Sequence, residues 1–366
     1  MKNLRITVVF ILLIFLVPLQ SGSDGIEKTL NEVFSVASPT GYEHSMVLTI
    51  KKLLPADSSF ETDSLGSLYL AFGDGGDHLA VLTGIDEIGY IVSGFDSQGY
   101  LNLDRVVPAP TPLFDSFQFG HPMTVWSASG PITGVLALPS LHIISREMRS
   151  DLQNVFSIEN AMVDIGVRSK EEAQARGIEI LDPVTPLARI SRLAGDRKSG
   201  PSFGTKVCTS LLLDVANDLL LKTSRQKTTF VWMAQTKFPA RRSRPRAGLG
   251  AVLAKKNLSA SRILIIGIYP MDSQVENHVS LGAGPVLVTP GGSDSDLSKR
   301  IIDIASRSVI PLQNADNFES MLLAPFLSST NVSGMFLPVK FPSTPNEVVD
   351  FRDVRSLVKL ISTLLQ

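Results

Sequence analysis

Hydrophobic and polar residues along this chain follow periods that predict helices and buried strands in alternation. Apolar residues recur at helical spacing in five segments, residues 26–35, 43–54, 206–221, 296–308 and 354–365. Short apolar runs bounded by turn residues predict strands at 68–72, 78–83, 228–234, 262–268 and 335–339. The run 79–82 is continuously hydrophobic, which is typical of a strand covered on both faces. This alternation predicts an α/β sandwich.

Residues 94–186 have a different pattern. Short β-like runs at 99–103, 123–126 and 132–138 alternate there with Gly, Pro, Ser and Asp. A short helix at 169–176 is expected to begin after Ser169 as its N-cap. We therefore expect a small all-β domain at 94–186, inserted into an α/β domain that comprises residues 24–93 and 187–366.

The first 23 residues differ from the rest of the chain. Lys2 and Arg5 precede a nearly continuous apolar run at 6–19, and small residues follow at 21–23. This order predicts a secretory signal peptide over residues 1–23, and hence an exported protein, secreted or periplasmic. The apolar run is shorter than the roughly 20 residues of a full membrane span. An uncleaved N-terminal membrane anchor is the alternative.

Composition limits the classes of partner and site. The chain has 366 residues, which indicates two or three domains. Its net charge is −1, so no global field favours a nucleic-acid partner. Cys208 is the only cysteine, which excludes an intramolecular disulfide and a cysteine-rich metal site, and its apolar surroundings predict a buried structural thiol. The five histidines lack the spacing of metal ligands.

Several motifs occur in a fixed order from residue 38 to the C-terminus. In chain order they are Ser38-Pro39-Thr40-Gly41-Tyr42-Glu43, Asp63-Ser64-Leu65-Gly66-Ser67, Gly84-Ile85-Asp86-Glu87-Ile88-Gly89, Asp164-Ile165-Gly166 with Ser169-Lys170-Glu171-Glu172-Ala173, Leu281-Gly282-Ala283-Gly284-Pro285, and Thr344-Pro345-Asn346-Glu347-Val348-Val349-Asp350-Phe351-Arg352-Asp353. Each motif is weak evidence by itself. The ordered set resembles the tetrahedral-aminopeptidase family of di-zinc metallopeptidases, which includes glutamyl and deblocking aminopeptidases.

The resemblance implies both a fold and a chemistry. The fold is a three-layer α/β/α sandwich of the zinc-aminopeptidase type with an inserted small all-β domain. The chemistry uses two zinc or cobalt ions that polarise the scissile carbonyl and activate a water, whose proton a glutamate takes. In the family the inserted domain mediates dimer contacts, and dimers build a hollow dodecamer. The resemblance therefore also implies a homo-oligomer, or co-assembly with an active relative.

This chain departs from the family wherever the resemblance places a metal ligand. Those five positions are Gly84, Gly204, Lys237, Gly267 and Ser343. Glycine has no side-chain ligand atom, serine is a poor zinc ligand, and lysine is a cation. Thr236 stands at the general-base position, where a hydroxyl cannot act as a base near neutral pH. We therefore expect no metal cofactor and no intact catalytic residue.

Charged residues remain near the former metal site. Asp86 is retained, and in the family it would orient the missing histidine. Lys206 and Lys237 fall at positions that should approach the site. One hypothesis is that their ammonium groups partly replace the missing metal charge and pair with Asp86 or Glu87. The alternative is that both lysines are solvated, as lysines usually are.

A basic run beginning at Arg241 and ending at Arg246 lies in a loop that the resemblance places near the site. It is a candidate for binding an anionic peptide terminus or a phosphate. A solvated loop is the alternative interpretation.

Two functions follow from this sequence. The first is an exported, metal-free pseudopeptidase that acts in peptide binding or assembly. The second is an active hydrolase with a relocated or non-metal site. Its candidate nucleophiles are Ser38, Thr236, Cys208 and Ser343. The second function requires a histidine or carboxylate within hydrogen-bond reach of one of these groups.

Overall fold

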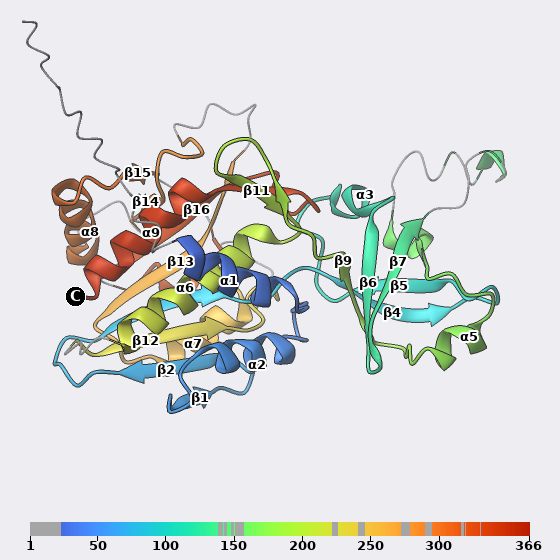
Figure 1. Cartoon of the computed structure of the whole chain (residues 1–366), viewed down its shortest axis with the longest axis horizontal. Helices are drawn as coiled ribbons and strands as arrows, with labels where there is room; N and C mark the ends of the chain where they lie inside the picture. The colour runs from blue at the N-terminus through green and yellow to red at the C-terminus, as the bar shows by residue number, and fades with distance from the viewer. Residues whose placement is uncertain are drawn as a thin grey trace, which may run out of the picture.

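The computed structural model describes residues 23–137, 142, 145–147, 150, 157–221, 226–240, 246–271, 279–289, 295–315, 318, 320–329 and 331–366. Within them lie a large mixed sheet covered by helices and a separate closed barrel (Figure 1). The expected signal segment lies outside the described residues except for Ser23, the first residue of α1. Within the described part of the chain, no helix is both long and apolar enough to cross a membrane.

The central sheet has the strand order β1-β2-β12-β3-β13-β16-β17-β11-β10, and β14 and β15 extend it beside β16. Its strands are β1 (Phe60–Thr62), β2 (Leu68–Phe72), β3 (Leu79–Gly84), β10 (Ser191–Arg192), β11 (Arg197–Gly200), β12 (Thr228–Met233), β13 (Arg262–Met271), β14 (Val286–Val288), β15 (Gln313–Asn314), β16 (Val332–Lys340) and β17 (Glu347–Asp350). The middle strands β12, β3, β13 and β16 are parallel, and antiparallel strands flank them. Parallel strands end at the same edge, so this order brings their carboxyl ends together.

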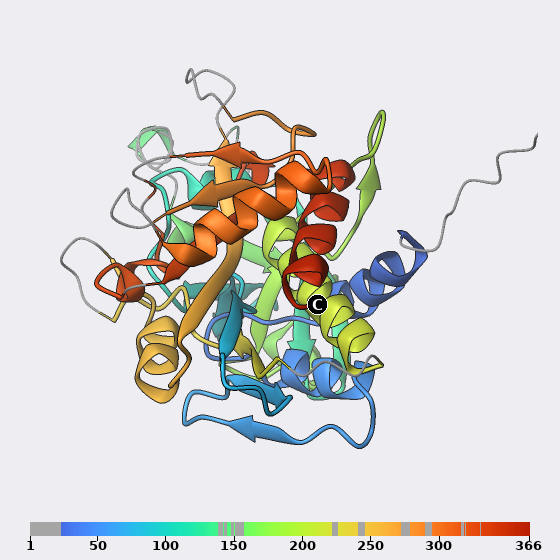
Figure 2. The same ribbon diagram turned by 90° about the vertical axis from the view of Figure 1, so that its left-hand side faces the viewer.

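Helices cover both faces of the sheet. One face carries α1 (Ser23–Phe34), α2 (His44–Leu53), α6 (Phe203–Leu220), α8 (Asp296–Arg307) and α9 (Phe351–Leu364). The other carries α7 (Leu249–Asn257) and the 3-10 helix η3 (Ala324–Phe326). Side chains alternate between the two faces along β3. Leu79 and Val81 pack in the core under the first group of helices, and Ala80 and Leu82 pack in the core under α7 and η3. Figure 2 shows α8, in orange, beside α9, in red.

The barrel has the closed strand order β4-β5-β8-β7-β6-β9. Its elements are β4 (Tyr90–Phe95), β5 (Leu101–Arg105), α3 (Phe114–Gln118), β6 (Pro122–Ser127), β7 (Gly130–Ala137), the 3-10 helix η1 (Ile158–Asn160), β8 (Met162–Asp164), α5 (Lys170–Ala175) and β9 (Pro183–Pro186). It has a core of its own, which includes Tyr90, Val125 and Val184. The boundary expected at residue 94 falls inside β4, which pairs with β5 and β9 from Tyr90 onward.

The predicted fold class is confirmed: an α/β/α sandwich carries an inserted small all-β domain, here a barrel. Ser169 caps α5 as predicted, accepting a hydrogen bond from the backbone N of Glu172. Helix α7 was not predicted. It begins at Leu249, between Gly248 and Gly250, and glycine lowers helix propensity.

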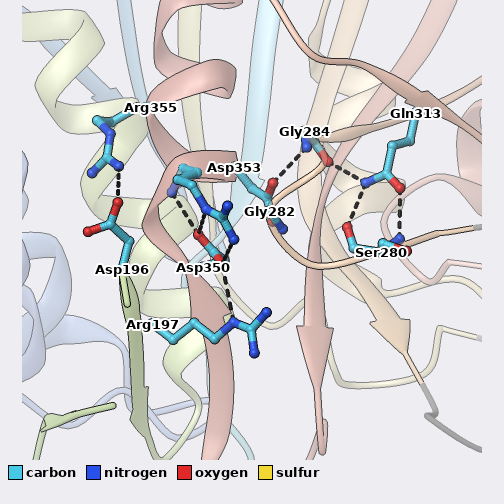
Figure 3. Close-up of polar contacts among 10 residues, drawn as sticks. Asp196, Arg197, Ser280, Gly282, Gly284, Gln313, Asp350, Asp353 and Arg355 are labelled. Carbon is cyan, nitrogen blue, oxygen red and sulfur yellow. Dashed lines mark hydrogen bonds and ion pairs between the residues drawn. The ribbon is translucent and has the colours of Figure 1, made fainter. Parts of the chain in front are cut away.

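Two of the sequence motifs meet at the start of α9 and stabilise the scaffold (Figure 3). The Asp353 carboxylate accepts hydrogen bonds from the backbone N of Gly282 at 2.8 Å and of Gly284 at 2.7 Å. Burial raises the pKa of Asp353 to about 6. Gly282 has φ +83°, a backbone conformation that residues with a Cβ rarely adopt, so this turn favours glycine.

Asp350 joins three elements in the same region. Its side chain caps α9 through the backbone N of Arg352 and pairs with the Arg352 guanidinium at 2.7 Å and with Arg197 of β11 at 3.2 Å. The hydrogen bond from Arg352 is the main reason that the pKa of Asp350 falls to about 2. Figure 3 also shows Arg355 directed toward Asp196. These motif residues therefore hold the fold together rather than lining the candidate site.

Candidate functional site

A cavity of about 520 Å³ lies at the carboxyl ends of the central parallel strands. Gly84 ends β3, Gly267 lies in β13 next to the residue paired with Thr83, and Thr236 follows the end of β12. Ligands of open α/β sheets bind at this edge. The cavity is mainly apolar. Its lining residues are Thr83, Gly84, Ile88, Val107, Pro108, Ala109, Pro110, Thr205, Cys208, Thr236, Lys237, Pro239, Arg246, Gly267, Ile268, Ser320, Met321 and Leu322.

The structure gathers the five positions at which the resemblance places metal ligands. Gly84, Lys237 and Gly267 line the large cavity. Lys237 also lines a smaller cavity of about 50 Å³, together with Ser343. Gly204 directly precedes Thr205, which lines both cavities. Positions that are far apart in the sequence therefore converge on one region of the molecule.

Neighbouring side chains occupy the space that larger residues would need at the three glycines. An added Cβ at Gly84 would lie 2.6 Å from Thr236 Oγ1, and one at Gly267 would lie 2.9 Å from a Phe336 ring carbon. At Gly204 it would lie 2.6 Å from a methyl of Ile268 and 2.8 Å from a methyl of Val339. Any larger side chain at these positions requires its neighbours to move.

The residues present do not fit the two zinc or cobalt ions that the resemblance implies. The three glycines offer no ligand atom, and Lys237 brings a positive charge to the site. Among the residues that the structure describes, no group of three or more His, Cys, Asp or Glu side chains is arranged to hold a metal ion. No catalytic step through a metal can be derived from this donor set.

Asp86 is fully buried beneath the cavity and organises its floor. Oδ1 accepts a hydrogen bond from Thr236 Oγ1. Oδ2 accepts hydrogen bonds from Thr40 Oγ1 and from the backbone N of Lys237, both at 2.8 Å. The carboxylate that would orient a histidine in the family here fixes Thr236 and the peptide that presents Lys237.

Lys206 forms a buried ion pair. Its Nζ lies 3.2 Å from Glu87 Oε1 and donates to the carbonyl of Val36 at 2.8 Å. Only 5% of the Lys206 side chain and 3% of the Glu87 side chain are exposed. The hypothesis that Lys206 pairs with Glu87 agrees with this contact. Lys206 does not line the cavity, so its ammonium is not placed to bind a ligand there.

Lys237 does not follow the hypothesis that its ammonium pairs with Asp86 or Glu87. Its backbone N, not its ammonium, bonds Asp86. Its Nζ lies 3.5 Å from Thr205 Oγ1, and within the described ranges no carboxylate lies at ion-pair distance from it. The side chain is half-buried and lines both cavities. Of the two lysines, Lys237 is therefore the one that a ligand can reach.

Two buried carboxylates near the site were not predicted. Glu43 accepts hydrogen bonds from the backbone N of Gly41 at 3.0 Å and of Gln235 at 2.8 Å, and burial, aided by nearby Asp86, raises its pKa to about 7. Glu347 accepts from the backbone N of Gly204 at 2.9 Å and of Ser343 at 2.8 Å, and burial raises its pKa. Both lie in the motifs that carried the resemblance, but nothing in the sequence showed which backbone groups they would bind.

The four candidate nucleophiles have different surroundings. Ser38 Oγ is buried without a hydrogen-bond partner in the described structure, and the Cys208 thiol donates to the carbonyl of Gly267 at 3.3 Å. Burial raises the pKa of Cys208, which disfavours a thiolate. Ser343 donates its backbone N–H to the Glu347 carboxylate. Of the four, Thr236 is the one whose hydroxyl meets a carboxylate.

Arg241, a predicted binding residue, lies outside the described residues. The end of the same basic run, Arg246, is exposed to solvent and lines the large cavity. The place of the basic run in the sequence could not show which of its residues lines the cavity.

Comparisons with known proteins give the family. A family model described as M42 glutamyl aminopeptidase matches residues 66–360, which is most of the chain. The chain belongs to this M42 family. The resemblance inferred from the ordered motifs is thereby confirmed, and the cavity lies in the scaffold of an aminopeptidase family.

Relatives of this M42 chain are distant in sequence. The lysyl aminopeptidase of Pyrococcus furiosus is 22% identical over 353 residues, covering 93% of this chain and 96% of that protein. FrvX of Escherichia coli strain K12 is 23% identical over 190 residues, and that match spans 51% of each protein. The chain thus spans about half the length of FrvX and nearly all of the Pyrococcus relative.

Solved structures of similar fold include TET aminopeptidases. The TET1 peptidase of Pyrococcus horikoshii, described as assembling into a tetrahedron or a large octahedral shell, has a TM-score of 0.79 at 22% identity, with 93% of this chain and 99% of that chain covered. The TET aminopeptidase of Thaumarchaeota archaeon SCGC AB-539-E09 has a TM-score of 0.79 at 19% identity, with coverages of 93% and 96%. At these identities the similarity shows the fold.

Proposed function

We propose that this M42-family protein is a catalytically inactive, metal-free pseudopeptidase that uses the aminopeptidase scaffold to bind peptides or to assemble. The observation that carries the proposal is the packing at Gly84, Gly204 and Gly267. Atoms of neighbouring side chains lie 2.6–2.9 Å from the position of an added Cβ at each of these glycines. Five positions without a zinc ligand, three of them tightly packed, favour binding over metal-dependent hydrolysis.

The chemistry of peptide hydrolysis supports the same proposal. A family peptidase needs a metal-activated water and a base near it. Here Thr236 stands at the base position and its hydroxyl donates to Asp86, while Lys237 places an ammonium beside the cavity. An ammonium disfavours a nearby cation by direct repulsion.

The test combines metal analysis with activity on the purified chain. After incubation with zinc or cobalt and removal of free metal, we expect far less than one metal per chain and no metal-dependent release from leucyl, lysyl or glutamyl chromogenic substrates. Stoichiometric metal together with metal-dependent turnover would overturn the proposal.

A second candidate function rests on the Thr236–Asp86 contact, which places a hydroxyl against a carboxylate at the cavity. It is hydrolysis without metal. Turnover that resists chelator and is lost in Thr236→Val, while it persists in the control Thr49→Val on α2, would favour this candidate. Absence of turnover in the presence of a chelator would rule out this second candidate function.

We further propose that the protein is exported and forms a homo-oligomer or co-assembles with an active relative. The basic start at Lys2 and Arg5, followed by the apolar run 6–19, supports export. An N-terminally anchored protein is the alternative, and N-terminal sequencing of the protein recovered from its compartment separates the two. The inserted domain supports assembly, because the family uses it for dimer contacts.

A further inference from the structure

The charges that line the large cavity are unsuited to a free amino terminus. Among the described residues that line it, only Lys237 and Arg246 are charged, and both are cations. A site for an α-ammonium group needs carboxylate acceptors. Two cations beside an apolar wall instead complement an anion that carries an apolar group.

The carboxylates nearest the cavity are already engaged. Asp86 accepts three hydrogen bonds from within the fold, and Glu87 pairs with Lys206. Glu347, which lines the smaller cavity, accepts the backbone N groups of Gly204 and Ser343 with its two oxygens. None of these three side chains lines the large cavity. They are therefore not placed to bind a ligand ammonium in it.

Lys237 retains hydrogen-bonding capacity. An ammonium has three N–H donors, and in the described structure its contact with Thr205 Oγ1, at 3.5 Å, is a long one. The Asp86 carboxylate accepts a hydrogen bond from the backbone N–H of Lys237, which fixes the position of the Lys237 backbone at the cavity. The volume of about 520 Å³ lies within the range of roughly 300–1,000 Å³ that is usual for small-ligand sites.

We propose that this cavity binds the free C-terminal carboxylate of a peptide whose last side chain is apolar. Lys237 and Arg246 bind the carboxylate, and Val107, Met321 and Leu322 contact the apolar side chain. This deepens the proposed peptide-binding function and rests on it. The aminopeptidase scaffold here selects the end of a peptide opposite to the one at which an aminopeptidase acts.

Calorimetric titration of the purified full chain tests the proposal with three ligands. They are N-acetyl-Leu-Leu-Phe with a free carboxylate, the same peptide as its C-terminal amide, and Leu-Leu-Phe amide with a free amine. Charge-assisted hydrogen bonds to one carboxylate should make the acid bind at least about tenfold more tightly than either amide. Inorganic phosphate, which lacks the apolar group, should compete weakly.

Variants locate the effect. Lys237→Met should remove most of the preference for the acid over the amide, and Arg246→Met, a change at an exposed residue, should remove part of it. Lys256→Met is the matched control, because this exposed lysine of α7 does not line the cavity, and it should retain the full preference. Thermal unfolding checks that each variant is folded.

The results separate the two proposals. Equal affinity for acid and amide, a preference that survives in both cavity variants, or no binding of any of the three peptides would overturn the carboxylate site. Metal-dependent hydrolysis of Leu-Leu-Phe amide would instead overturn the pseudopeptidase proposal.

Discussion

At the scale of single residues, the site is defined by what packs against its glycines. Thr236 contributes both a hydrogen bond to Asp86 and the atoms closest to an added Cβ at Gly84. Leu322 is next, at 3.4 Å from the same point. Thr236, which the resemblance places at the base position, thus closes the space beside Gly84, which it places at the histidine position, so we expect the two positions to depend on each other.

This dependence predicts a coupling between Gly84 and Thr236. Gly84→Ala should destabilise the protein by about 1–3 kcal/mol, because its Cβ must displace Thr236 Oγ1. Thr236→Ala removes the Oγ1 and methyl atoms that the new Cβ would displace. In that background, the loss of stability caused by Gly84→Ala should be smaller by about 1 kcal/mol or more. Urea unfolding of the four proteins measures this cycle. Gly94→Ala is the control, since its Cβ would be 3.5 Å from its nearest neighbour, Asn102 Nδ2. Equal costs in both backgrounds would refute the coupling.

The sequence showed where the glycines are, but not what fills the space beside them. Motif order placed Gly84, Gly204 and Gly267 at the former ligand positions. Ile268, Val339 and Phe336, which approach Gly204 and Gly267, come from neighbouring strands of the sheet, and their contacts depend on strand register. Register between β13 and β16 is a tertiary property, so local periodicity does not determine it.

At the scale of elements, Glu43 links the start of α2 to the loop after β12. It precedes α2, and its carboxylate accepts the backbone N of Gln235, a residue at φ 52°. Sequence periodicity predicted α2 and β12. It did not predict that a single buried carboxylate would join them, because that contact spans nearly two hundred residues of chain.

Glu43 should make stability depend on pH. Burial raises its pKa from about 4.5 to about 7 in the folded protein, so the folded state keeps a proton that the unfolded state releases. The stabilisation from this group is fully present below pH 4.5 and is lost as the pH rises to about 7. Glu43→Gln should remove this pH-dependent loss of stability. The unfolding free energy of Glu43→Gln minus that of the unaltered protein should therefore rise by up to roughly 3 kcal/mol between pH 4.5 and 8.

Urea unfolding at several pH values between 4.5 and 8 measures the effect of Glu43→Gln. Glu61→Gln, at an exposed position of β1, is the matched control and should follow the unaltered protein throughout. Parallel pH profiles for Glu43→Gln and the unaltered protein would show that Glu43 has no raised pKa in the folded state.

At the scale of the whole molecule, the sandwich and the barrel each have a separate hydrophobic core, and the large cavity is lined by residues from both. Val107 to Pro110 follow β5 of the barrel, whereas Gly84 and Gly267 belong to the sheet. A peptide in this cavity would contact both domains. The proposed assembly through the barrel and the proposed ligand binding at the cavity would therefore involve the same inserted segment.

The barrel also carries an apolar surface suited to assembly. We define the α3 patch as Leu113, Phe117 and Phe119, whose exposed fractions are 58%, 41% and 44%. Leu113 and Phe117 are one helical turn apart, so they share a face, while Phe114 and Gln118 of the same helix are buried. Exposed apolar groups of this size at one place are typical of interaction surfaces.

We therefore expect the purified chain to be larger than a monomer by light scattering after size-exclusion chromatography. The double variant Leu113→Glu with Phe117→Glu should reduce the mass, because charge in the α3 patch opposes apolar contact between copies. Val309→Glu is the matched control: Val309 is 88% exposed and lies beyond α8 on the sandwich, so its substitution should leave the mass unchanged. A monomeric unaltered chain would overturn the homo-oligomer. An oligomer that persists in the double variant would show that the contact between copies does not involve the α3 patch. Burying two carboxylates without partners would cost more free energy than such an interface can tolerate.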